Sequence, residues 1–328
     1  MPPIIDVKGL HKDFKVMQRR AGMFGAVQNL FMPRFRTIHA VDGVSFTLQE
    51  GELVGYLGPN GAGKSTTVKV LTGLLVPTSG EVLSGGLIPW KARNKYVAQI
   101  GAVFGQRTTL WWDLPVLDSL ELMQAIYKIQ PERFRRNLAD FVDLLEMQSF
   151  LNTPVRSLSL GQRMRADLCA ALLHEPRLVF LDEPTIGLDV VAKERIRQFI
   201  LHINRQRGAT VLLTTHDLSD VERLCERVMI IDHGRLLYDG GLSALQERFG
   251  GAWTLAVDFS EEYANIDLPG LPPPLREGRR VIYTFDHNHQ SAPDLIAALL
   301  ANYKIADLEV RRPALENTIR RIYEEKLL

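Results

Sequence analysis

The residue types best suited to chemistry stand together in Gly58-Pro59-Asn60-Gly61-Ala62-Gly63-Lys64-Ser65-Thr66, which we call the phosphate loop. A polyphosphate needs several backbone N–H groups pointing toward it, and glycines allow the tight backbone of such a nest. Lys64 can then reach the β- and γ-phosphates, and the Ser65 hydroxyl can ligate Mg²⁺. The spacing G-x-x-x-x-G-K-[ST] therefore predicts that the chain binds a nucleoside triphosphate.

The segments on either side of the phosphate loop have the expected character. Residues 51–57 form a turn and a short apolar strand, and residues 65–75 carry apolar side chains at helical spacing. A helix that begins here adds the positive end of its dipole to the site. The order strand, glycine loop, helix is the context that such a motif requires.

Polar residues also follow other apolar runs that read as strands. Residues 178–181 are all apolar, as in a strand buried on both faces of a parallel sheet, and Asp182 and Glu183 follow directly. Asp182 can hold the Mg²⁺ shell, and Glu183 can accept a proton from an attacking water. Gln106 and His216 end two further strands, where Gln106 can ligate the metal or position the water and His216 can bond the γ-phosphate. A single Gln or His at a strand end is more often structural, but this combination favours nucleotide hydrolysis.

A second anion site is indicated by Leu158-Ser159-Leu160-Gly161-Gln162, which we call the signature segment. Ser159 and Gly161 at the start of a helix make an anion site of the same type as the phosphate loop. The segment follows a helical region, so we expect it to lie away from the first phosphate site. A phosphate bound by a second copy of the protein would explain its presence.

Composition sets broad limits on function. The chain has 328 residues, enough for roughly two domains. Hydrophobic residues at 46%, charged residues at 23% and a net charge of +1 are ordinary for a globular protein and indicate no general attraction to nucleic acid. The sequence shows neither a membrane-spanning apolar run nor a signal-peptide layout. Cys169 and Cys225 are expected to be buried thiols in a reducing compartment, which suggests a cytoplasmic setting.

The order of elements predicts two domains. Alternating strands and helices indicate a mostly parallel α/β domain over residues 1–241, interrupted by a helical subdomain at about 107–165. Residues 242–328 change in character and predict a small α+β domain. Residues 17–37 combine basic and aromatic side chains with no acidic residue, and residues 22–31 could form a short amphipathic helix. We expect this insertion to contact a membrane surface or a membrane partner, the alternative being a surface insertion between two strands.

Taken together, these motifs resemble the ATP-binding subunits, or nucleotide-binding domains, of ABC transporters. The resemblance covers residues 4–240 and rests on the Walker A loop at 58–66, the Q-loop residue Gln106, the signature at 158–162, Walker B at 178–183, the D-loop Gly187-Leu188-Asp189 and the switch residue His216. Phe14 matches the adenine-stacking position, which is usually Tyr, and Leu160 replaces a residue that is more often Ser or Gly. The resemblance implies a P-loop NTPase core with an antiparallel β subdomain, an inserted helical subdomain and a C-terminal α+β domain.

The resemblance also implies a mechanism. Two subunits, identical or paralogous, would bind two ATP molecules with Mg²⁺, each between the phosphate loop of one subunit and Ser159, Gly161 and Gln162 of the other. Glu183 would activate water with help from Lys64, Gln106 and His216, and Asp189 would couple the two sites. Hydrolysis would move separate transmembrane permease subunits, held near Gln106 and the Trp111-Trp112 pair, at the cytoplasmic face of the membrane.

The branch that the chain resembles comprises the multidrug-, sodium- and daunorubicin-exporter ATPases, with a similar closing segment at 311–316, so we expect export. A soluble ABC ATPase acting on ribosomes or nucleic acid is an alternative, but those proteins carry two cassettes or long coiled coils. An importer subunit is another, but its C-terminal domain is usually larger and richer in strands. No nucleic-acid partner is expected.

Overall fold

A computed structural model describes residues 2–18, 34–105, 108–263, 266–268, 270–287 and 289–324. The chain forms two compact units, residues 1–240 and residues 241–328. Gln106 and the helix expected over residues 22–31 lie outside the described residues.

A six-stranded sheet forms the centre of the first unit, with strand order β5-β6-β7-β3-β8-β9. The strands are β3 (Leu53–Leu57), β5 (Ile100–Phe104), β6 (Leu178–Asp182), β7 (Thr210–Thr214), β8 (Arg227–Asp232) and β9 (Arg235–Gly241). Neighbouring strands from β5 to β8 pair in parallel. Parallel strands end at one edge of the sheet, so the residues that follow β3, β6 and β7 come together there.

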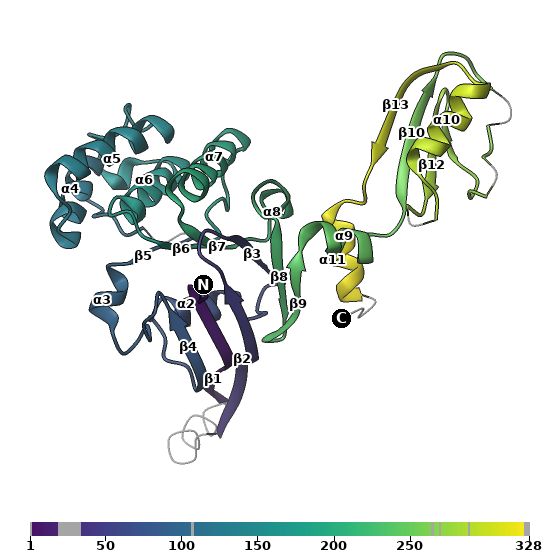
Figure 1. The fold of residues 1–328 in the computed structure, drawn as a ribbon. Coiled ribbons are helices and arrows are strands. Elements are labelled where there is room, and N and C mark those ends of the chain that lie inside the picture. Colours follow the sequence, from purple (N-terminus) through teal and green to yellow (C-terminus); the bar gives the residue numbers. More distant parts are fainter. Residues whose placement is uncertain are drawn as a thin grey trace, which may run out of the picture. The chain divides into compact units, whose positions relative to one another are not determined.

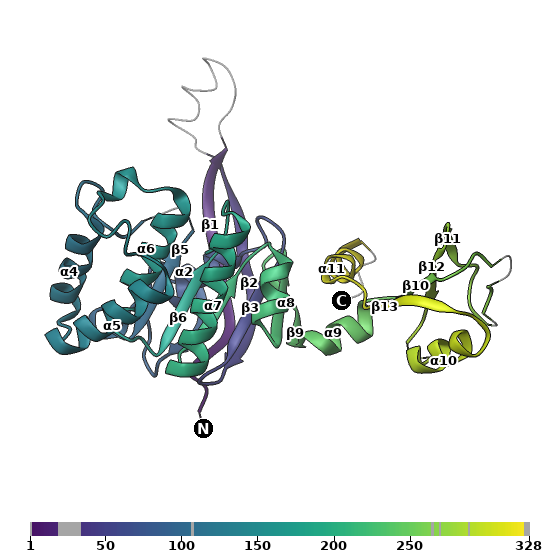
Figure 2. The same ribbon diagram turned by 90° about the horizontal axis from the view of Figure 1, so that it is seen from above.

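The described helices of this unit are α2 (Lys64–Leu71), α3 (Arg93–Val97), α4 (Val116–Tyr127), α5 (Pro131–Leu144), α6 (Leu160–Leu172), α7 (Val190–Arg207) and α8 (Leu218–Leu224), with a 3-10 turn at Val155–Ser157. Figure 1 shows α6, α7 and α8 on one side of the six-stranded sheet. In Figure 2, α4, α5 and α6 gather beside β5 and β6. The helical region predicted between β5 and β6 is therefore present.

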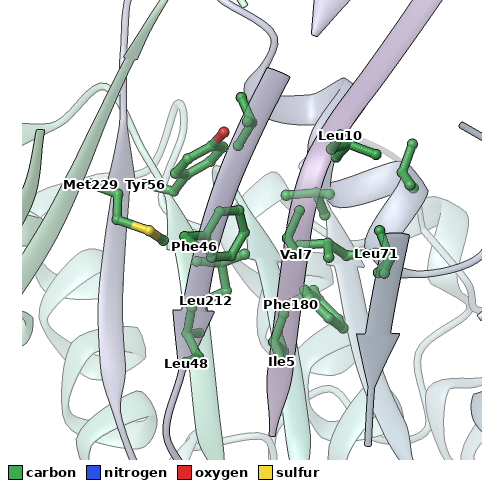
Figure 3. Close-up of a cluster of buried hydrophobic side chains, with 14 of the residues drawn as sticks. Ile5, Val7, Leu10, Phe46, Leu48, Tyr56, Leu71, Phe180, Leu212 and Met229 are labelled. Atoms are coloured by element: carbon green, nitrogen blue, oxygen red, sulfur yellow. The ribbon is translucent and has the colours of Figure 1, made fainter. Parts of the chain in front are cut away.

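On the other side of the parallel sheet lies an antiparallel sheet of order β2-β1-β4, made of β1 (Ile5–Gln18), β2 (Arg34–Leu48) and β4 (Ser79–Ser84). Val7 and Phe46 from this sheet pack with Tyr56 and Phe180 from the parallel sheet and with Leu71 of α2 in one buried core (Figure 3). Burial of such side chains stabilises the fold by roughly 1.5–3 kcal/mol each.

Two details of this sheet differ from the sequence prediction. The sequence Thr78-Ser79-Gly80 is typical of a turn, but strand β4 begins at Ser79 because His11 of β1 pairs with it. The sequence pattern predicts strands within residues 4–16 and 38–48, but β1 and β2 continue as a paired ribbon to Gln18 and Arg34. The described side chains on this ribbon are exposed, so its sequence does not alternate between apolar and polar residues and does not indicate where the strands end.

The second unit is an α+β structure. Its antiparallel sheet has the order β11-β12-β10-β13. Its elements are α9 (Leu242–Phe249), β10 (Trp253–Phe259), β11 (Leu275–Glu277), β12 (Arg280–Phe285), α10 (Ala292–Asn302), β13 (Ile305–Arg311) and α11 (Leu315–Glu324). Leu295 and Leu299 of α10 join Leu255 and Tyr283 in the core of this unit.

Cys169 and Cys225 are both free and buried, as expected. Across the described helices, none combines the length and the apolar character needed to cross a membrane.

Candidate functional site

The phosphate loop connects β3 to α2 and is curled tightly. A Cβ atom on Gly58 would lie 2.3 Å from the carbonyl oxygen of Ile231, so only glycine fits there. Gly63 has φ of 109°, in the region that favours glycine. The Lys64 ammonium donates to the carbonyl oxygens of Gly58 at 2.7 Å and Pro59 at 3.1 Å. Burial lowers the pKa of Lys64. The two contacts to loop carbonyls show that the loop folds around the side-chain nitrogen of Lys64.

The start of α2 strengthens this anion site. Its N-cap is Gly63, which supplies no side-chain hydrogen bond, and its first turn holds no acidic residue. The first backbone N–H groups of the helix and the positive end of its dipole are therefore left for a bound anion. This is the arrangement that a nucleotide phosphate requires.

Ser65 and Asp182 meet at the ends of neighbouring elements. The Ser65 hydroxyl donates to Asp182 Oδ1 at 3.2 Å, and the Thr214 hydroxyl donates to the same oxygen. The backbone N–H of Gly105 donates to the carbonyl of Asp182 at 2.7 Å, which fixes the end of β6 against β5. A hydroxyl and a carboxylate on adjacent elements fit Mg²⁺, which prefers oxygen ligands. When bound there, Mg²⁺ would neutralise charge on the phosphate oxygens.

Glu183 and His216 form a pair beside this point. His216 Nδ1 lies 3.3 Å from Glu183 Oε1, and the Glu183 side chain is 24% exposed. Glu183 has φ of 56°, which is uncommon for a residue other than glycine. Its backbone N–H donates to the carbonyl of Thr214 at 2.9 Å, so this conformation is held by β7. Strained residues of this kind are common at functional sites.

A buried network behind Glu183 and His216 was not predicted from the sequence. Asp220 is fully buried and accepts from the Thr185 hydroxyl at 2.5 Å and from Arg197 Nε at 2.6 Å. Thr185 follows Glu183 by two residues, and Asp220 belongs to α8, which begins just after His216. The network therefore fixes both segments to α7. Its members come from a turn and two helices that are separate in the sequence, so no local sequence pattern reveals it.

The signature segment forms the start of α6. Ser159 accepts from the backbone N–H of Gln162 at 3.2 Å, and Gln162 Oε1 accepts from the backbone N–H of Ser159 at 2.9 Å, a complete capping box. Gly161 packs against Leu188 and Ala192. Within the described part of the chain, none of the hydrogen bonds made by this segment involves the phosphate loop.

Asp189 caps α7, because its carboxylate accepts from the backbone N–H of Ala192 at 2.9 Å. Phe14 lies on β1 opposite Ile38 and is 36% exposed, with the Lys12 ammonium 5.3 Å from the centre of its ring. Two residues beyond Ile38, the Ala40 carbonyl lies against Gly63 of the phosphate loop. Gln106 lies outside the described residues, between Gly105 and Thr108.

Comparisons with known proteins agree with this geometry. Residues 41–186 match the family model described as ABC transporter. The ABC transporter ATP-binding protein NatA of Bacillus subtilis (strain 168) is 31% identical over 217 residues, which are 66% of this chain and 88% of NatA. The Nod factor export ATP-binding protein I of Rhizobium sp. (strain N33) is 35% identical over 66% of this chain and 71% of that protein.

A solved dimeric ATP-binding cassette in a post-hydrolysis state, bound to ADP and Pi, has a similar structure. Its TM-score is 0.60 at 27% identity, over 73% of this chain and 98% of that chain. The fold and the ordered site residues thus lead to the same family as the sequence comparisons. This chain belongs to the ABC transporter family, in which it is an ATP-binding protein with ATPase activity.

Proposed function

We propose that this chain powers a transporter by closing as a dimer around two MgATP and opening after hydrolysis. Each ATP would lie between the phosphate loop of one copy and Ser159, Gly161 and Gln162 of the other. The second copy is either identical or a paralogue. Closing and opening of this dimer move separate transmembrane subunits, which the dimer contacts at the cytoplasmic face of the membrane.

The observation that carries this proposal is that the phosphate loop and the signature segment share no hydrogen bond within the described part of the chain. The phosphate loop has an uncapped helix start, and the signature segment has its own helix start that bonds within itself. We propose that a triphosphate held by Lys64 contacts only the phosphate loop of its own chain, which leaves the signature segment for a nucleotide held by another copy. The dimeric form of the similar cassette bound to ADP and Pi supports this arrangement.

Hydrolysis within this dimer follows from the residues around Asp182. Glu183 accepts a proton from the attacking water, and His216, 3.3 Å from it, orients that carboxylate and bonds the γ-phosphate. Lys64 leaves the loop carbonyls to bind phosphate oxygens. Gln106 helps to hold the metal and the water. Phe14 stacks on the adenine ring.

Asp189 has the position to link the two nucleotide sites. It caps α7 beside the signature segment, which meets Ala192 and Leu188 in the same chain. A shift of the signature segment on nucleotide release would therefore reach the start of α7.

A groove in the first unit offers a place for a transmembrane partner. It has a volume of about 230 Å³ and a mostly apolar lining that includes Leu74, Arg93, Phe104, Met123 and Tyr127. Exposed Trp111, Trp112 and Ile126 lie on neighbouring segments. A short amphipathic helix of a membrane subunit would bury this apolar surface. Export as the direction of transport is supported by the Nod factor export relative.

The Glu183→Gln variant tests the proposal. The amide retains the size of the side chain but cannot accept the proton, so MgATP should bind without turnover and hold two copies together. Sedimentation of the purified chain should show a monomer without nucleotide and a dimer containing two ATP with it.

Glu121→Gln, an exposed residue of α4, is the matched control and should hydrolyse ATP like the parent. Ser159→Arg combined with Glu183→Gln should still bind ATP but remain monomeric, because the bulky cation occupies the contact with the second copy. Rapid turnover by Glu183→Gln, or a dimer that survives Ser159→Arg, would contradict the proposed arrangement.

A further inference from the structure

Residues Thr108–Asp113, which we call the strap, connect the Gln106 region to α4 and lie against α6. Asp167 of α6 is 3% exposed and faces the strap. Its Oδ1 atom accepts from the Thr108 hydroxyl at 2.9 Å, the Thr109 backbone N–H at 2.9 Å and the Thr109 hydroxyl at 3.2 Å. Three donors from one segment thus meet a single carboxylate oxygen of another.

A second set of contacts holds the other end of the strap. The guanidinium of Arg163 lies 4.6 Å from the centre of the Trp112 ring. Arg156 donates its backbone N–H to the Trp112 carbonyl at 2.9 Å and Nη1 to Asp113 at 2.7 Å. Arg163 and Asp167 are one turn apart on α6. The strap is therefore attached to the helix whose first turn carries Ser159 and Gly161.

The strap also reaches the groove described above. Thr109 is one of the residues that line it, so a segment seated in the groove would touch the strap directly. The same residue gives two hydrogen bonds to Asp167. Thr109 therefore lies between the groove and the signature helix.

Burying the carboxylate of Asp167 between α6 and the strap carries a desolvation cost. Burial raises the pKa of Asp167, while the bonds from Thr109 and Thr108 oppose that effect. An apolar side chain of similar volume would avoid the desolvation cost but would leave the Thr109 N–H without this acceptor. The carboxylate therefore contributes through the direction of its hydrogen bonds, which fix where the strap lies on α6.

We propose that Asp167 is a positioning residue that makes the strap and α6 move as one body. A partner segment that binds in the groove then shifts Ser159 and Gly161. Conversely, nucleotide binding at the signature segment shifts the strap residues that line the groove. This inference rests on the proposed function, which assigns the groove to a partner and the signature segment to the second half of the ATP site.

Hydrogen exchange of the full-length chain tests the inference, with Glu183→Gln as the parent so that ATP stays bound. In the parent, MgATP should slow exchange in both the signature segment and the strap. In Asp167→Leu, the signature segment should still respond to MgATP but the strap should not, and the Thr109 amide without nucleotide should exchange at least about tenfold faster. Asp167→Asn keeps one acceptor oxygen and should give an intermediate result.

Asp140→Asn is the matched control, because Asp140 lies on α5 and pairs with Arg207 at 2.9 Å. It should keep the joint response of the parent. A purely structural role for Asp167 would lower the melting temperature and leave the strap and signature responding together, and that result overturns the inference. If Asp167→Leu does not fold, the double variant Thr108→Val/Thr109→Val removes both hydroxyl donors and should also separate the two responses. If MgATP leaves the signature segment of the parent unchanged, the proposed function fails, and the inference falls with it.

Discussion

The hydroxyl of Ser65 donates to Oδ1 of Asp182 at 3.2 Å, although the two residues are 117 positions apart in the sequence. Parallel pairing explains the contact, because β7 lies between β3 and β6 and pairs with each of them. Thr214 of β7 donates to the same oxygen and completes the link. The sheet itself thus holds a hydroxyl and a carboxylate within hydrogen-bond distance of each other.

Asp182→Asn should weaken the use of Mg²⁺ in hydrolysis. An amide offers the metal one neutral oxygen in place of a charged carboxylate, so turnover at limiting Mg²⁺ should fall by about 10–100-fold. The measurement is ATPase activity as a function of Mg²⁺ concentration. Asp140→Asn on α5 is the control, and an unchanged Mg²⁺ requirement in Asp182→Asn would exclude a ligand role for Asp182.

Lys64→Ala should weaken ATP binding. Loss of the ammonium removes a charge-assisted bond to phosphate, which is worth about 1.5–3 kcal/mol, so affinity should fall by at least about tenfold. Lys69→Ala is matched in chemistry and lies exposed in the last turn of the same helix, so it should bind ATP normally. Titration with a fluorescent ATP analogue measures both, and equal affinities would refute the role of Lys64.

Gly58→Ala should destabilise the fold, whereas Gly161→Ala should not. The added methyl at 58 would lie 2.3 Å from a backbone oxygen, while at 161 its nearest neighbour is 3.4 Å away. Overpacking of this kind costs about 1–3 kcal/mol. Urea unfolding of the two variants gives the comparison, and similar stabilities would show that the loop can relax around the methyl.

His174 should make stability depend on pH. It stacks on Tyr127 with ring centres 4.0 Å apart, and burial lowers its pKa from 6.5 to about 4. Between these two values the unfolded chain binds more protons, so the free energy of unfolding decreases as pH falls through this window, by about 3 kcal/mol in total.

Urea unfolding at about pH 7 and about pH 5 measures this dependence. His174→Phe retains a ring against Tyr127 and should lose part of the sensitivity to acid. His233→Gln removes an exposed histidine and should behave like the parent. The same acid sensitivity in His174→Phe and in the parent would contradict the assignment.

The sequence predicted those parts of the fold where local pattern and structure coincide. The apolar run at 178–181 is buried as a strand, and residues 190–207, which look helical in the sequence, form α7. Strand β4 was missed because its existence depends on β1, some 70 residues earlier. Strand β9 and helix α9 were missed where short polar segments gave no clear period.

The same distinction applies to the candidate site. The phosphate loop, Asp182, Glu183 and His216 could be predicted because each directly follows an apolar strand, and the parallel sheet then brings them together. Asp220 and Asp167 could not, because each gathers donors from segments distant in sequence. A buried carboxylate on a helix looks like an ordinary surface residue until its neighbours are known.

The left-handed backbone of Glu183 has a consequence for the evolution of this chain. A residue other than glycine that is held at φ of 56°, as Glu183 is, costs the native state about 1–2 kcal/mol. Selection for thermal tolerance alone would favour glycine at this position, and the resulting protein would melt no lower while losing the proton acceptor that we propose. With the role that we propose for Glu183, stability and activity oppose each other at this position, and directed evolution for heat resistance should be screened for turnover at every round.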